Sequence, residues 1–89
     1  MVYQVSGRIL NGWLVSPDGS LCYQFYLNPK SLLEGFPFVF INEWTMRPDG
    51  IPFQLKRRSK LPLDDALELC CQMLLEGWSK LVTRFRSYA

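Results

Sequence analysis

The 89-residue chain contains no histidine, and this absence excludes several kinds of chemistry. Histidine is the commonest general base, proton shuttle and metal ligand in proteins. A serine or cysteine nucleophile would lack its usual imidazole partner. No glycine-rich fingerprint for binding phosphate occurs either. We therefore expect a protein that is not an enzyme and that carries no cofactor or metal ion.

Long hydrophobic runs are also absent. No stretch approaches the roughly 20 apolar residues that a membrane-spanning helix needs. The first ten residues lack the basic start and the apolar run of a secretory signal peptide. An odd number of cysteines, three, argues against a framework of disulfides. These absences predict a cytoplasmic protein without a membrane partner.

The three cysteines do not have the spacing of a metal site. Cys70 and Cys71 are adjacent on a predicted helix, where their side chains point about 100° apart. Cys22 alone cannot complete a four-ligand zinc site. We interpret all three as small buried hydrophobic residues. The alternative is a redox-active thiol at whichever of Cys70 and Cys71 is exposed.

Core-forming residues are plentiful. Hydrophobic residues make up 48% of the chain and aromatic residues 15%, which is more aromatic content than the core of so short a chain usually needs. Some rings are therefore expected at the surface or at an interface. The length predicts a single compact domain over residues 1–89, because domains usually have roughly 100–150 residues.

Residues 62–77 form the most periodic segment and predict a helix. Pro62 suits the first position of a helix, where its missing N–H costs no hydrogen bond. Asp64 and Asp65 would lie near the positive end of the helix dipole. Gly77 would follow the last turn in a left-handed conformation.

This helix has more apolar surface than contact with one sheet requires. One stripe at helical spacing comprises Leu63, Ala66, Leu67, Cys70, Met73, Leu74 and Gly77. The apolar residues outside it form a candidate protein-interaction surface: Leu69, Cys71, Leu75 and Trp78. An arm or loop of the same chain would cover this second side, or an oligomer contact would. The polar stripe of Asp64, Glu68, Gln72 and Glu76 is typical of a solvated helix; the alternative is an acid–base or metal site.

The remaining segments predict strands. Pro17-Asp18-Gly19 and Pro48-Asp49-Gly50 are turn sequences that would each close a hairpin. The expected strands are residues 13–15, 21–27, 38–46, 52–58 and 80–86, with residues 1–11 as an edge strand or an unpaired arm. The resulting fold is α+β, a four- to five-stranded, mainly antiparallel sheet in the order ββββαβ with one helix packed on one face.

Alternation assigns faces to these strands. Leu21, Tyr23, Phe25 and Leu27 share one face. The start of strand 38–46 is apolar on both faces, so this strand is either central or faces a partner. In strand 52–58, alternation predicts Phe53 and Leu55 toward the core and Gln54, Lys56 and Arg58 outward.

A basic run supplies the second candidate surface. Residues 1–50 carry three basic and four acidic residues, whereas residues 51–89 carry seven and four, although the net charge is only +2. Alternation puts Lys56, Arg58 and Lys60 on one face and Arg57 on the other, and a neighbouring last strand would add Arg84 and Arg86. Beside aromatic rings, these cations would resemble a platform for single-stranded nucleic acid. The alternative is a charged edge strand that prevents aggregation.

Two functions follow from these surfaces. The first is a non-catalytic protein-interaction module, with a homodimer as one form, which requires no chemistry that the residues lack. The alternative is an accessory nucleic-acid-binding protein that uses Lys56, Arg57, Arg58, Lys60, Arg84 and Arg86.

The order of several short motifs carries a family resemblance. They are Gly12-Trp13-Leu14-Val15, Pro17-Asp18-Gly19, the basic run through Leu61, Asp65-Ala66-Leu67-Glu68-Leu69 and Leu74-Leu75-Glu76-Gly77-Trp78. Together they resemble a family of small proteins from marine picocyanobacteria of the Synechococcus and Prochlorococcus type, whose function is unknown. The resemblance runs from Gly12 to Phe85. It implies a compact stand-alone protein and no activity that can be assigned to residues.

Overall fold

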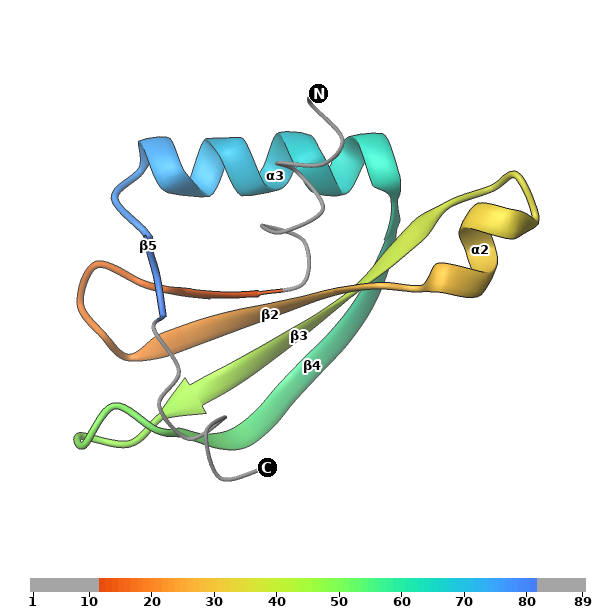
Figure 1. The fold of residues 1–89 in the computed structure, drawn as a ribbon. Helices are drawn as coiled ribbons and strands as arrows, with labels where there is room; N and C mark the ends of the chain where they lie inside the picture. Colours follow the sequence, from red (N-terminus) through yellow and green to blue (C-terminus); the bar gives the residue numbers. More distant parts are fainter. Residues whose placement is uncertain (1–11, 82–89) are drawn as a thin grey trace.

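A computed structural model describes residues 12–81 as an antiparallel five-stranded sheet with one long helix across one face (Figure 1). The elements are β1 (Trp13–Val15), β2 (Leu21–Leu27), α2 (Pro29–Leu33), β3 (Phe38–Met46), β4 (Pro52–Pro62), α3 (Leu63–Leu75) and β5 (Ser79–Lys80). The strands lie in the order β4-β3-β2-β1-β5. The predicted α+β class and its antiparallel sheet are confirmed, with α2 as an added short helix.

Hydrogen bonds to one aspartate organise the turn between β1 and β2. The Asp18 carboxylate accepts from the Ser20 N–H at 3.0 Å and from the hydroxyls of Ser16 and Ser20 at 2.7 and 2.8 Å. Gly19, with φ of +77°, takes the left-handed position of this turn. In the second turn Asp49 accepts from the Ile51 N–H at 3.3 Å. Both predicted Pro-Asp-Gly turns therefore connect antiparallel strands.

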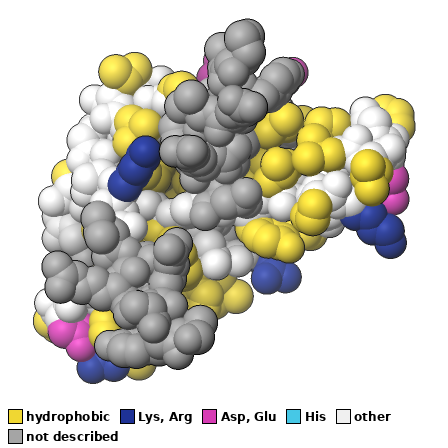
Figure 2. Space-filling view, viewed as in Figure 1, with side chains coloured by type: hydrophobic (Ala, Val, Ile, Leu, Met, Phe, Trp, Pro, Cys, Tyr) yellow, Lys and Arg dark blue, Asp and Glu magenta, His cyan; other side chains and the backbone are white. Residues whose placement is uncertain are grey.

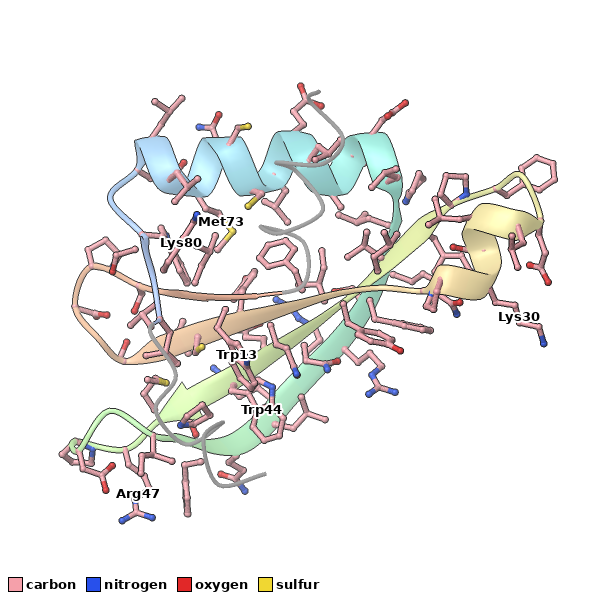
Figure 3. The ribbon with its side chains drawn as sticks, in the orientation of Figure 1. Trp13, Lys30, Trp44, Arg47, Met73 and Lys80 are labelled. Carbon is pink, nitrogen blue, oxygen red and sulfur yellow. The ribbon has the colours of Figure 1, made fainter. Side chains whose placement is uncertain are left out.

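The core lies between α3 and the sheet. The helix buries Leu63, Ala66, Cys70 and Met73, which recur at helical spacing on one side. The sheet contributes Leu14, Phe25, Val39 and Ile41. Figure 3 shows Met73 pointing from α3 toward the sheet. The predicted face of β2 is confirmed, since Tyr23, Phe25 and Leu27 all pack in this core.

Helix α3 is slightly shorter than predicted, and its first N–H, that of Leu63, donates to the Pro37 carbonyl at 3.0 Å. Pro62 was expected at the first helical position but is the N-cap residue, so the helix begins one residue later, at Leu63. It ends at Leu75. Beyond it, the Gly77 N–H donates to the Leu74 carbonyl at 3.2 Å and the Trp78 N–H to the Met73 carbonyl at 3.0 Å. This pair of bonds is a Schellman motif, with Gly77 at φ +101° as its left-handed residue.

Strand β4 continues four residues beyond its predicted end and contains two irregularities. The register with β3 shifts between Glu43 and Trp44 and again between Thr45 and Met46. The prediction that Phe53 and Leu55 face the core is wrong: both side chains are exposed. Each bulge adds a residue to one strand, and simple alternation therefore loses its phase.

Two predictions fall on residues that the structure does not describe. The expected strand or arm over residues 1–11 lies outside residues 12–81. Of the expected strand 80–86, only the start is described, where β5 pairs with β1.

Candidate binding surface

The sheet face opposite α3 carries an unusual concentration of aromatic rings. In an antiparallel sheet with one face on the core, the other face is commonly polar. Here the strand register places rings from three strands on it, together with two amides and two cations. We call this surface the aromatic face and define it by Trp13, Gln24, Tyr26, Phe38, Phe40, Asn42, Trp44, Arg58 and Lys60. No described strand residue on this side is acidic.

Cross-strand neighbours arrange the aromatic face in rows. Tyr26 on β2, Phe40 on β3 and Lys60 on β4 lie directly opposite one another. The Phe38 ring meets the Phe40 ring edge-on, with 5.2 Å between their centroids. Tyr26 is the most exposed of these rings, at 51%. This end of the face therefore presents a cluster of rings that ends in a cation at the β4 edge.

A second aromatic pair lies farther along the same face. The rings of Trp13 and Trp44 are 6.1 Å apart and tilted by 44°. Figure 3 shows the two side chains together, on the side of the sheet away from Met73. Both are half-buried, so they present less ring surface than Tyr26.

Both cations on the aromatic face lie against rings. The Lys60 Nζ atom is 4.5 Å from the centroid of Phe38, and the Arg58 Cζ atom is 5.5 Å from that of Phe40. These distances are within the range of cation–π attraction. The attraction keeps positive charge next to apolar ring surface, where it can meet an anion.

A chain of hydrogen bonds fixes the direction of Arg58. Its Nε donates to Asn42 Oδ1 at 2.8 Å, and Asn42 Nδ2 donates to Gln24 Oε1 at 2.9 Å. Trp44 Nε1 donates to the same Gln24 oxygen at 3.2 Å. The amides therefore satisfy one another, and the terminal nitrogens of the Arg58 guanidinium point beyond this network.

The basic run divides between two sides of the sheet. Arg57 donates to Glu43 at 3.0 Å, and Lys56 lies 4.0 Å from the same carboxylate, on the side of α3. The prediction that Lys56 shares a face with Arg58 and Lys60 is wrong. Two residues, Lys56 and Arg57, oppose the single Glu43 across the bulge, and the extra residue turns Lys56 toward that carboxylate. Within residues 12–81, only Arg58 and Lys60 supply cations to the aromatic face.

The last strand begins at the edge of the sheet that is far from the basic run. Strand β5, the described start of the last strand, pairs with β1 at the edge opposite β4. The described start of the last strand therefore does not neighbour the basic strand, the condition under which Arg84 and Arg86 would extend the basic run. Arg84 and Arg86 themselves lie outside the described residues.

The predicted interaction surface on α3 is not one exposed patch. Leu69 and Trp78 pack against the core, and the Trp78 ring lies 5.1 Å from that of Tyr23. Cys71 and Leu75 are exposed. The second apolar side of α3 is thus partly core, and only two of the four predicted residues face solvent.

Burial covers two of the thiols and disfavours their thiolate forms. It raises the pKa of the Cys22 thiol to about 12 and that of Cys70 to about 11, with a further increase at Cys70 from neighbouring Cys71. Both behave as the predicted buried hydrophobic residues, whereas Cys71 is exposed. The acidic stripe of α3 is solvated as expected: Gln72 donates to Glu76 at 3.1 Å on an exposed surface.

The described residues offer neither a metal-binding cluster nor a membrane-spanning helix. Within residues 12–81, no three cysteine or carboxylate groups gather closely enough to hold a metal ion. No helix of this part of the chain has the length and apolar content to cross a membrane.

Sequence reasoning anticipated the rings but missed their arrangement. The sequence predicts more rings than the core needs, but it does not say which of them lie at the surface or on which face. Gln24 and Asn42 were not predicted as site residues. A signal existed, because every second residue from Phe38 to Trp44 is an aromatic or amide residue. Alternation alone could not say that β2 and β4 add a tyrosine and two cations to the same side.

Comparisons with known proteins identify a family. No curated protein and no solved structure matches the chain. The family model described as "Protein of unknown function (DUF1651)" matches residues 11–85. The expected origin of such proteins in marine picocyanobacteria stays a prediction. Because the match covers most of the chain, this protein belongs to the DUF1651 family.

Proposed function

We propose that this protein is a non-catalytic, cytoplasmic binding protein that holds single-stranded nucleic acid on its aromatic face. The observation that carries the proposal is the combination, on one face of the sheet, of exposed ring surface with two cations and no described acidic strand residue. Single-stranded nucleic acid offers flat bases for stacking and phosphates for ion pairing. An uncharged surface of a partner protein would contact the rings but would leave the two cations without an opposite charge.

Each part of the aromatic face has a role in this proposal. Tyr26 and Phe40 provide stacking surface for neighbouring bases. Lys60, which lies across from Phe40 at the β4 edge, binds a phosphate. Arg58 binds the next phosphate with the terminal nitrogens that Asn42 leaves available. Asn42 is a positioning residue and contacts no ligand.

The small number of cations predicts modest affinity with a shallow salt dependence. Neutralising two phosphates of a single strand gives a slope of log K against log salt of about −1.4. The Glu43 carboxylate already compensates Arg57 and Lys56, so these two side chains add little. The net charge of +2 agrees with a weak overall electrostatic attraction.

The test measures anisotropy of a fluorescently labelled 12-mer of deoxythymidine and of the matching RNA at several salt concentrations. We expect Arg58→Gln/Lys60→Gln to lower affinity at low salt by roughly tenfold and to bring the salt slope close to zero. Lys30→Gln/Arg47→Gln is the control, because it removes equal charge from exposed positions away from the aromatic face (Figure 3). We expect this control to retain binding.

Two results would contradict the proposal. One is no binding of either oligonucleotide at about 100 μM protein and low salt. The other is equal loss in both double variants, which would indicate non-specific attraction to total charge. Circular dichroism of each variant establishes that the fold is retained.

A second candidate function is a protein-interaction module, and one observation favours it. Leu33 and Phe36 are large apolar residues with 89% and 82% of their surface exposed, at the end of the sheet beside α2. Side chains of this kind with so little cover are typical of contact sites when they cluster. The test is a measurement of the protein's molar mass in solution, which would rise on self-association.

A further inference from the structure

An apolar projection stands at the end of the molecule that carries α2. It comprises Leu32, Leu33 and Phe36, and we call it the α2 knob; at 50%, 89% and 82% exposure, all three side chains face solvent. Figure 1 shows α2 at the end of the long strands, away from the helix that covers the sheet. Figure 2 shows hydrophobic side chains over this region, with charged side chains at its margin.

A pocket of about 450 Å³ lies directly beside the α2 knob. Two segments line it, residues 35–38 and 60–64. Most of its lining residues are apolar, among them Phe36, Pro37, Phe38, Leu61 and Pro62. The volume is within the range of pockets that enclose a bound group. An aromatic side chain suits this lining better than a polar one.

The knob and the pocket share Phe36, so a two-fold axis through this end can bring both into contact at once. In such a contact, the same patch serves both molecules, and the knob of each enters the pocket of the other. The charges around the patch are self-complementary. They comprise one of each sign on α2 and its cap, Lys30 and Glu34, and one of each sign lining the pocket, Lys60 and Asp64.

We propose that this patch binds a second copy of the same chain and forms a weak homodimer. A strongly acidic or basic partner would leave two of these four charges facing like charge, whereas a second copy can pair each with its opposite. The rings and leucines of both copies would bury on the order of 1,000 Å². This area lies at the low end for specific interfaces and predicts dimers only at high protein concentration.

This inference deepens the second candidate function. The pocket shares Phe38 and Lys60 with the aromatic face, whereas Arg58 belongs to the aromatic face alone. Sedimentation velocity of the full chain, from about 5 to 500 μM, should give a mass that rises from monomer toward dimer. We expect Phe36→Ser to weaken the dimer about tenfold or more, because each interface loses two central rings. Phe53→Ser is the matched control, since Phe53 is an exposed phenylalanine at 65% that lies outside the pocket.

Three results would overturn the proposal: a monomer at 500 μM, undiminished dimer in the Phe36→Ser variant, or equal weakening in the Phe53→Ser variant. Phe36 is exposed, so its replacement should leave the fold intact, and circular dichroism checks this. The two proposals are separable with Arg58→Gln, which removes a cation of the aromatic face but no residue of the pocket. That variant should bind oligonucleotide more weakly and dimerise normally.

Discussion

At the scale of single residues, Asp18 couples the first hairpin to pH. The Ser20 backbone N–H, followed by the hydroxyls of Ser16 and Ser20, lowers the pKa of this carboxyl from 3.8 to about 2. Each donor stabilises the ionised form. Because the pKa is lower in the folded state, the carboxylate stabilises the fold above about pH 4, and this contribution is lost as the pH falls toward 2.

The titration of Asp18 can be measured directly. In an NMR titration, its carboxyl carbon should have a midpoint close to pH 2. Asp18→Asn should lower the urea midpoint of unfolding at pH 7 and lower it much less at pH 2, where about half of the native carboxyl groups are protonated and most of their contribution is lost. A difference between the two proteins that stays constant across this range would refute the assignment.

At the scale of elements, Gly77 ends α3 and directs Trp78 to the core. Its φ of +101° is strained for any residue with a side chain, while an added Cβ would only touch Pro17 at 3.4 Å. Gly77→Ala should therefore lower the free energy of unfolding by about 1–2 kcal/mol through backbone strain and not through a clash. Urea denaturation measures this loss. The exposed Ser79→Ala, two residues on, should have almost no effect, and an equal loss there would rule out the explanation.

At the scale of the whole molecule, sequence reasoning predicted the architecture better than the surfaces. The turns, the helix and the core face of β2 follow from local chemistry, because Pro-Asp-Gly and the apolar period of α3 act within a few residues. The positions of Phe53, Leu55 and Lys56 could not be predicted, because each depends on bulges set by pairing with β3. The neighbour of β5 could not be predicted either, since strand order is a property of the complete sheet.

The aromatic face could be predicted from the sequence only in part, because it depends on the whole sheet. Individual rings in excess of the core can be counted in a sequence. Their meeting with Arg58 and Lys60 requires the order of three strands and their registers. The hydrogen bonds from Arg58 through Asn42 to Gln24 join residues that are far apart along the chain, and no spacing rule in the sequence indicates them.

The bulge at Lys56 makes this point of β4 tolerant of a change in chain length. Arg57 pairs with Glu43 and Leu55 with Trp44, so removing Lys56 would join two segments that are already in register. Deleting Ser59, three residues on, would instead exchange the two faces of one segment of the strand. We expect the Lys56 deletion to fold and the Ser59 deletion to unfold, as judged by circular dichroism and thermal melting. The opposite ranking would be incompatible with the register. Members of the family that are one residue shorter would then be expected to have their gap here, inside a strand, where gaps are ordinarily rare.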